Sequence, residues 1–492
     1  MRRNAAVSVH QCHCLTRAKL LYWKANENLW AKGFICMQKQ AVLEQPRLRL
    51  FDNAALTRLI LPLIVEQFLT IAVGMVDSVM VSSVGEAAVS AVSLVDTVNV
   101  LIVNLFAALA TGGAVVAGQY LGRQDRENAE KAGNQLILFT GAAALVVMAL
   151  VYLGHNVLLD VVFGHLAPDV RAYCSTYLLI VAASIPFIAL YNSGAALFRI
   201  MGNSNVSMAV SIAMNTVNIA GNALLIYRLR MGVAGAAIPT LVSRVLAAVM
   251  MLAWLRSPGL TIRLRVPFEF RFDRGMVGRI LRLGVPNGLE NSMFQLGKIV
   301  LLSLVASFGT ASIAANAVGN SIASFQSLAG MAMSMAMVAV ISRCVGAGDE
   351  EQVRYYTRKL MKICYAAMLL TNLLIMLALP LILRAYNLSA ETMEMARQVL
   401  LLHGTFSCLT WPLAFTLPNA LRAANDVRFS MVVSVLSMWM FRIVCGFVFA
   451  KSLGLGMFGT WAAMMIDWAV RSAFFVWRIR SGGWKRAAFE RI

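Results

Sequence analysis

The sequence is poor in charged residues. Only 13% of its 492 residues are Asp, Glu, Lys or Arg, whereas soluble proteins carry roughly 25%. Hydrophobic residues make up 59% of the chain, and its mean hydropathy is +0.72. So few charges cannot cover the surfaces of several soluble domains, and so apolar a chain is not intrinsically disordered. The composition therefore indicates a polytopic membrane protein.

Sequence motifs for disulfides, nucleotide binding and catalysis are also missing. Of the eight cysteines, Cys12 and Cys14 lie in an N-terminal His/Cys cluster, and the other six are scattered, mostly in apolar stretches where a thiol acts as a small apolar group, so they predict no disulfide framework. No G-x-x-x-x-G-K-[ST] stretch occurs, which disfavours an ATP-driven pump. His155, His165 and His403 stand apart from one another, which disfavours a membrane-embedded enzyme. We therefore expect no enzyme activity and no resident cofactor or metal.

Long apolar stretches are abundant. A membrane-spanning helix needs about 20 mainly apolar residues, and segments bounded by charges, Gly and Pro supply about twelve of them. Backbone groups facing lipid must be satisfied within the segment, so spans of this length are predicted to be helices and the fold to be all-α. The candidate spans lie near 59–82, 88–117, 134–154, 173–197, 205–226, 233–254, 284–307, 312–342, 361–383, 398–420, 430–450 and 457–477.

The net charge of +20 is distributed over the short connections. From residue 37 onward, alternate loops and tails hold 27 Lys and Arg on one side of the predicted membrane and six on the other. Because Lys and Arg are retained on the cytoplasmic side, both termini are predicted to be cytoplasmic. The charge is therefore a topology signal, and its dispersal with few interleaved aromatics disfavours nucleic-acid binding.

The spans predict a division of the chain into two halves. We expect an N-terminal extension at 1–54, six-helix lobes at 55–254 and 283–478, a basic linker at 255–282 and a tail at 479–492. Residues 1–36 fit none of this pattern. We expect them to be either a disordered extension or the result of a start codon assigned too early, in which case Met37 begins the functional chain. Their His/Cys cluster at 10–14 leaves a metal site as an alternative, although its spacing matches structural zinc poorly.

The chain repeats itself at an offset of 224 residues. Four landmarks recur in the same order, which indicates duplication. Because each half has an even number of spans, the halves are predicted to be parallel repeats that form two lobes around a central cavity. The matched residues are Pro62 and Glu66 with Pro286 and Glu290, Gly122 and Asp125 with Gly346 and Asp349, Gly232 and Gly235 with Gly456 and Gly459, and, at an offset of 223, Arg199 with Arg422.

These features resemble the multidrug and toxic compound extrusion (MATE) transporters of bacteria, over about residues 55–478. The most specific pieces are LPLIVEQFLTIAVGMVDSVMVSSVG, GQYLGRQD, IMGNS and NTVNIAGNALLI followed by MGVAGAAIPT. The resemblance implies a secondary antiporter in the bacterial inner (cytoplasmic) membrane. Such a protein exports drugs or toxic, cationic or amphipathic compounds against inward flow of H+ or Na+, by rocker-switch motion of two lobes.

Asp77 is the first candidate for ion coupling. It matches the first-span Asp of the family, which the resemblance implies binds the proton or cation. Burial disfavours an ionised carboxylate, so Asp77 can alternate between two protonation states; an alternative is a position in the wet headgroup region. Asn218 and Asn222 share a helical face with Asn215. Some family members carry an acid at the position of Asn222, so the first lobe of this chain has less negative charge with which to hold Na+. We therefore expect H+ rather than Na+ coupling, with Asn218 and Asn222 as hydrogen-bond partners of Asp77. The alternative is that these Asn residues only hold helices together.

Five residues are candidates for the substrate cavity: Glu66, Asn215, Glu290, Phe294 and Lys298. Glu66 and Glu290 follow matching prolines by four residues and either attract cationic substrate or satisfy local backbone groups. Some family members place the seventh-span Glu where this chain has Phe294. Lys298 lies two turns after Glu290 and needs a counter-ion, either Glu290 or an acid across the cavity.

The expected partners are a small-molecule drug or metabolite, H+ or Na+, and the lipid bilayer, with no nucleic acid and a monomeric state. The rival function is a flippase for a lipid-linked intermediate of the same superfamily. Such a flippase favours several Arg or Lys inside its cavity to hold pyrophosphate. The cavity candidates Glu66, Asp77 and Glu290 against Lys298 favour cations instead.

Overall fold

The computed structural model describes residues 49–162, 167–264, 271–386 and 388–489, so the predictions made for 1–36 lie outside the described residues. The described residues from Phe51 onward belong to one compact unit. Its first half contains α2 (Asn53–Ser82), α3 (Glu86–Gly122), α4 (Arg126–Val157), η1 (Leu158–Val162), α5 (Pro168–Ala183), α6 (Ile185–Ile200), α7 (Ser204–Asn222), η2 (Ala223–Arg228) and α8 (Ala234–Trp254), where η marks a π-helical segment.

The second half repeats this order. It contains α9 (Arg274–Ala306), α10 (Thr310–Gly346), α11 (Glu350–Ala385), α12 (Ala390–Trp411), η3 (Pro412–Thr416), α13 (Leu417–Ala423), α14 (Val427–Ser437), η4 (Met438–Val444), α15 (Cys445–Phe447), η5 (Val448–Ser452), α16 (Gly456–Arg480) and α17 (Trp484–Phe489). The prediction of an all-α protein is confirmed for the part of the chain that is described.

The predicted spans all coincide with helical segments. Among the described residues, ten helices are long and apolar enough to cross a membrane, or eleven if the pair α5 and α6 is one span bent by 43°. Pro186 follows the bend and has no N–H to continue the helix ladder, which accounts for it. The twelfth predicted span is α16, in which Asp467 and Arg471 lower the hydropathy.

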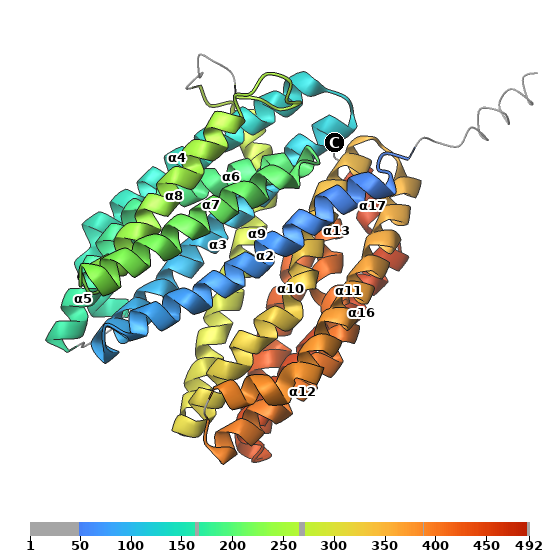
Figure 1. Ribbon diagram of the computed structural model, residues 1–492. Coiled ribbons are helices and arrows are strands. Elements are labelled where there is room, and N and C mark those ends of the chain that lie inside the picture. The colour runs from blue at the N-terminus through green and yellow to red at the C-terminus, as the bar shows by residue number, and fades with distance from the viewer. Residues whose placement is uncertain (1–48, 163–166, 265–270, 387, 490–492) are drawn as a thin grey trace, which may run out of the picture. The chain divides into compact units, whose positions relative to one another are not determined.

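The helices form two groups (Figure 1). In the first group, coloured cyan to green, α4, α5 and α6 pack against α3, and α7 and α8 pack against each other and against α6. In the second, coloured yellow to red, α11 and α12 pack against α10, and α16 packs against α12. The groups meet where α3 contacts α9 and α10, and where α2 contacts α10. Helix α9 begins at Arg274, inside the predicted linker 255–282, and α17 lies in the predicted tail.

The repeated landmarks have matching structural roles. Asp125 and Asp349 cap α4 and α11, each accepting a hydrogen bond from the backbone N–H three residues later, at 3.1 and 3.0 Å. Such caps satisfy backbone donors that have no partner within the helix. Gly122 and Gly346 lie at the crossing of α3 and α10, where an added Cβ would collide with backbone carbonyl oxygens of Arg343 and Gln119 respectively. The repeat therefore marks positions that fix helix ends and the contact between the two halves.

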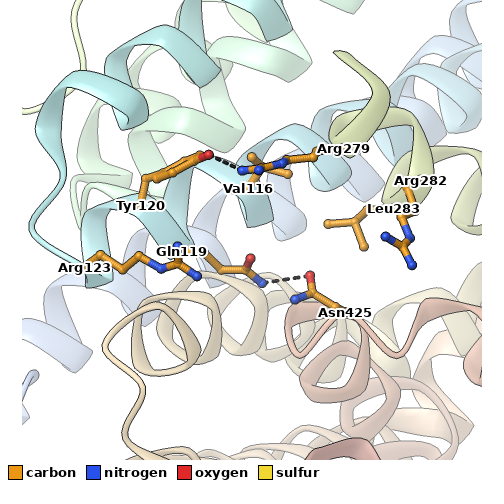
Figure 2. A pocket seen from close by; sticks show the side chains of 8 residues that line it. All are labelled: Val116, Gln119, Tyr120, Arg123, Arg279, Arg282, Leu283 and Asn425. Carbon is orange, nitrogen blue, oxygen red and sulfur yellow. Dashed lines mark hydrogen bonds between the residues drawn. The ribbon is translucent and has the colours of Figure 1, made fainter. Parts of the chain in front are cut away.

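The contact between the halves is close and polar at its end (Figure 2). The Gln119 side chain, on α3, donates hydrogen bonds to the Ala423 carbonyl at 3.0 Å and to Asn425 Oδ1 at 2.9 Å. Arg279 of α9 donates to the Tyr120 hydroxyl. We call these contacts, together with the crossings at Gly112 and Gly122, the seam. The contacts of Gln119 and Tyr120 and the crossing at Gly122 lie at helix ends that lead into the loops predicted to be cytoplasmic, and Gly112 lies ten residues before the end of α3, against Gly284 of α9.

Candidate functional site

Asp77 lies inside the first group of helices, near the end of α2. Its Oδ1 accepts a hydrogen bond from Asn222 Nδ2 at 2.8 Å. The Asn218 carboxamide can be oriented so that both its nitrogen and its oxygen have hydrogen-bond partners. In that orientation Asn218 Nδ2 lies 3.0 and 3.1 Å from the two carboxylate oxygens of Asp77, and Asn218 Oδ1 accepts a hydrogen bond from Thr240 Oγ1 at 3.2 Å. Helices α2, α7 and α8 thus place three sequence-predicted residues and Thr240 in one cluster, and we call it the Asp77 cluster.

A second acid lies beside this cluster. Asp96 of α3 accepts a hydrogen bond from the Tyr177 hydroxyl at 3.4 Å. Arg244 donates to Ser184 Oγ at 2.7 Å and to Asn99 Oδ1 at 3.4 Å, and it interacts electrostatically with both Asp77 and Asp96. Among the described residues no Lys or Arg lies within ion-pair distance of Asp77. Its direct partners are therefore neutral amides.

Glu66 and Glu290 do not reach the Asp77 cluster. Glu66 pairs with Arg199 at 2.5 Å and also accepts from Ser207 Oγ at 2.9 Å. Glu290 pairs with Arg422 at 2.6 Å, and Arg422 donates to Asn419 Oδ1 at 2.8 Å. Both carboxylates are buried. Each acid is thus neutralised within its own half, and Glu290 has Arg422 rather than Lys298 as its counter-ion.

A small cavity lies between these two ion pairs. It has a volume of about 230 Å³ and is lined by both Arg199 and Arg422, by the amides of Asn287, Asn291 and Asn419, and by Thr111, Ser334 and Met335. The rest of its wall is apolar, and the cations on it are those of the two ion pairs. The expectation that free carboxylates at 66 and 290 attract cations into a central cavity is therefore not matched by this arrangement.

A larger cavity lies on the far side of the seam. Its volume is about 480 Å³, and it lies between α2, α3 and α9. Asp96 lines it from the first half and Lys298 from the second, with Gln295 beside the lysine. Phe294 is partly buried one turn from Lys298, whose ammonium lies 5.4 Å from the centre of the phenyl ring. We call this space the outer cavity.

One face of α7 joins the two polar regions of the first half. It carries the buried polar residues Ser207, Ser211, Asn215, Asn218 and Asn222, spaced three or four positions apart. Asn215 donates to Ser211 Oγ at 3.4 Å. The stripe begins at Glu66, to which Ser207 donates, and ends at Asp77. Asn215 is therefore placed between the two acids and not in the central cavity.

Sequence reasoning missed several members of these clusters. Arg199 and Arg422 were found as repeat landmarks but not as partners of Glu66 and Glu290, although all four recur together. Tyr177 and Thr240 carried no signal of their own, because isolated polar residues occur in most spans, and Arg244 stood out as a charged residue in a span but without an indicated partner. Their roles follow from the packing of α2, α3, α5 and α8, which the sequence does not specify.

Comparisons with known proteins agree with this architecture. A family model described as MatE matches residues 62–224 and again 286–448, at the 224-residue offset of the repeat. The uncharacterized transporter YisQ of Bacillus subtilis is 27% identical over 91% of this chain and 97% of its own. The probable multidrug resistance protein NorM of Thermotoga maritima is 24% identical over 88% and 93%.

Solved structures show the same fold. A MOP superfamily transporter from Pyrococcus furiosus has a TM-score of 0.82 at 20% identity, covering 88% of this chain and 96% of its own. An outward-facing multidrug resistance MATE family transporter has a TM-score of 0.80 at 20% identity with the same coverage. The predicted two-lobe fold is thereby confirmed. Since the two family matches span well over half of its length, the chain belongs to the MatE family of multidrug efflux transporters.

Proposed function

We propose that this transporter is a cation-coupled secondary antiporter that exports amphipathic small molecules. The observation that carries the proposal is Asp77, a carboxylate inside a membrane-spanning helix that has amide partners and no ion pair among the described residues. A carboxylate in a membrane span costs several kcal/mol if it stays charged and unpaired, so such residues usually serve ion or proton movement. Asp77 is thus the coupling residue in this proposal.

The coupling ion we favour is H+. Both Asn218 and Asn222 direct N–H groups at Asp77, and an N–H donor stabilises a carboxylate but cannot ligate a cation. A bound Na+ needs several oxygen ligands, as hard cations do. The described part of the chain holds no cluster of three or more His, Cys, Asp or Glu suited to a metal ion. A proton needs only one carboxylate, which the Asp77 cluster supplies.

The polar face of α7 offers the proton a route. Glu66 and Asp77 are separated by eleven residues of α2, or about 16 Å at 1.5 Å per residue. The hydroxyls and amides of the α7 stripe cover this interval with groups that both donate and accept hydrogen bonds. In this proposal a proton released from Asp77 leaves toward the side of Glu66.

The two unlike ends of the structure support alternating access as part of this proposal. The seam closes the side on which the predicted cytoplasmic loops lie, and the outer cavity lies on the other side. In this proposal the conformation described above is open to the outside. Rocking of the two lobes about the crossing of α3 and α10 converts it into a conformation that is open to the cytoplasm. We further propose a monomer in the bacterial inner membrane, with both termini cytoplasmic.

The flippase alternative remains the weaker one. Arg199 and Arg422 line the central cavity, as a pyrophosphate site requires, but each is paired with a glutamate. A pyrophosphate would have to displace both carboxylates from their guanidinium groups. The unpaired Asp77 instead favours ion-coupled export.

The experiment is counterflow in proteoliposomes with H+ and Na+ gradients imposed separately. We expect an imposed pH gradient to drive efflux of an amphipathic dye by the wild type, and Asp77→Asn to abolish it. The matched control is Asp169→Asn, the same change at an exposed acid near the start of α5, which should transport as the wild type does. Full pH-driven transport by Asp77→Asn would refute the assignment, and transport driven only by Na+ would refute the choice of ion.

A further inference from the structure

The two lobes differ in polarity at matching positions. At the repeat offset of 224 residues, Asn218 of the first lobe corresponds to Arg442 of the second, and Asp77 corresponds to Leu301. Where the first lobe holds a carboxylate and an amide in contact, the matching positions of the second lobe hold an apolar side chain and a guanidinium. Duplicated halves thus carry opposite charge at one structural site.

Three cations surround Phe294 in the second lobe. The guanidinium carbons of Arg442 and Arg471 lie 5.3 and 5.4 Å from the centre of its ring, and the Lys298 ammonium also lies 5.4 Å from it. These distances are those of cation–π contacts. The three side chains come from α9, η4 and α16, which the fold brings together, and we call them the cationic cluster.

The single carboxylate of Asp467 is not enough to neutralise the three cations of this cluster. Asp467 pairs with Arg471 at 2.8 Å and accepts from Ser437 Oγ at 2.6 Å. Arg442 donates to the sulfur of Met464 at 2.9 Å, and no carboxylate among the described residues lies within ion-pair distance of Arg442 or Lys298. Buried charges are normally paired, because the desolvation of an isolated ion costs several kcal/mol.

Unsatisfied donors accompany the excess charge. Arg442 is 9% exposed and Arg471 is 2% exposed. Arg442 Nε and Arg471 Nη2 are buried without a hydrogen-bond partner among the described residues. Both side chains are thus more than nine-tenths buried and have spare donors. Lys298 is exposed, lines the outer cavity and interacts electrostatically with Arg442.

We propose that Lys298, the one member of the cationic cluster among the described residues that line the outer cavity, binds the anionic group of the transported molecule, a carboxylate attached to an apolar or aromatic body. The carboxylate pairs with Lys298 at the wall of the outer cavity, where the positive potential of Arg442 and Arg471 adds to its attraction. The apolar body lies along the valines of α2 and α3, and a positive group on the same molecule faces Asp96 across the cavity. The proposal rests on the export function and adds the substrate class, amphipathic carboxylates including zwitterions.

Equilibrium binding tests the proposal without any ion gradient. The full chain in phosphatidylcholine nanodiscs is titrated by calorimetry at neutral pH with naphthoate, naphthylmethylammonium and naphthalenemethanol, with empty nanodiscs as the blank. These three probes share one apolar body and differ in charge. We expect naphthoate to bind at least about tenfold more tightly than the alcohol, a difference of about 1.4 kcal/mol.

The variants separate a binding role from a structural one. Lys298→Gln changes an exposed side chain and should lower naphthoate affinity roughly tenfold without altering the affinity for the alcohol, and Lys298→Arg should retain most of it. The matched control is Lys451→Gln, an exposed lysine 5.8 Å from the ring of Phe447, which should leave binding unchanged. Naphthoate affinity equal to that of the alcohol, or unaltered by Lys298→Gln, would overturn the proposal. If the wild type showed no pH-driven efflux, the binding results would still stand. The proposed coupling to H+ and the proposed binding of carboxylates can therefore fail independently.

Discussion

Neighbouring groups separate the embedded acids into two kinds. Protonating Glu66 or Glu290 would leave Arg199 or Arg422 as an unpaired buried cation, which is costly. Protonating Asp77 breaks no ion pair, because its hydrogen-bond partners are neutral amides and Arg244 interacts with it only electrostatically. A change of protonation state therefore costs least at Asp77. The glutamates instead hold α2 to α6 and α9 to α13.

The first prediction concerns the ion pair in the first lobe. Arg199→Gln leaves the buried Glu66 without its cation, and removal of one partner from a buried pair destabilises by about 3 kcal/mol. We expect a lower thermal unfolding temperature of the protein in nanodiscs, followed by intrinsic tryptophan fluorescence. Because the pair recurs at Glu290 and Arg422, Arg422→Gln should have a similar effect.

The double variant Glu66→Gln with Arg199→Gln tests whether the unpaired charge of Glu66 causes the loss of stability. It removes both charges, so no unpaired buried ion remains and much of the lost stability should return. If the double variant is as unstable as the sum of the two single variants, the arginine acts through packing and not through its charge.

The second prediction concerns pH and lies outside the membrane spans. Asp273 caps α9, and hydrogen bonds from Lys131 at 2.5 Å and from the Met276 N–H hold its pKa below the usual value of 3.8. A lowered pKa in the folded state stabilises the fold above pH 3.8, and this contribution is lost as the pH falls below that value. Asp273→Asn keeps a capping side chain but should weaken the decline of the unfolding temperature between about pH 4 and pH 2. An unchanged pH profile would contradict this role, and Asp169→Asn is the matched control.

At the scale of elements, helix α7 combines two unusual features. Its polar face faces α2, and the helix passes directly from Asn222 into the π-helical segment η2. A π-helical segment recurs at the matching place of the second half as η5. Such segments are frequent at functional sites because they shift the register of side chains. In α7 the shift begins directly after the residue that donates to Asp77.

The third prediction tests the stripe on α7. If Asn215 only joins helices, Asn215→Leu should cost about 0.6 kcal/mol of stability and leave transport unchanged. If it carries protons between Asp77 and Glu66, pH-driven efflux should fall roughly tenfold, or about 1.4 kcal/mol on the barrier. We expect the second result, measured as initial rates in proteoliposomes. The control is Asn134→Leu on α4, away from the stripe.

The sequence predicted the elements better than their contacts. Every predicted span coincides with helical segments, because length and hydropathy are local properties. The span 173–197 contains a bend that Pro186 explains but that its hydropathy did not reveal. The pairing of Glu66 with Arg199, and the meeting of Lys298, Arg442 and Arg471 at one ring, depend on helix packing, and no local pattern encodes it.

At the scale of the whole transporter, the seam opposes the outer cavity. In the proposed mechanism export requires the seam to open, so the strength of the seam would set how often the opposite conformation is reached. The seam depends on glycine: an added Cβ at Gly112 would lie 2.7 Å from the backbone nitrogen of Gly284 and 2.9 Å from its Cα. Backbone atoms cannot yield as side chains can, so α3 and α9 would have to separate.

The fourth prediction follows from this contact. Gly112→Ala should weaken the closed seam by about 1–3 kcal/mol, the usual cost of overpacking, and so raise the population of molecules with an open seam. Cys344 lies on α10 beside this seam and is fully buried. Its labelling by a maleimide, followed by mass spectrometry of the peptide, should become faster in the variant.

The matched control is Gly74→Ala, also within a helix, where an added Cβ meets nothing within 4 Å. It should leave the labelling rate of Cys344 unchanged, because no backbone opposes the new methyl group. Equal labelling rates in wild type and Gly112→Ala would mean that α3 and α9 separate without opening the region of α10. The seam would then consist of two independent contacts, and rocking of the lobes as rigid bodies would be the wrong description of the exchange.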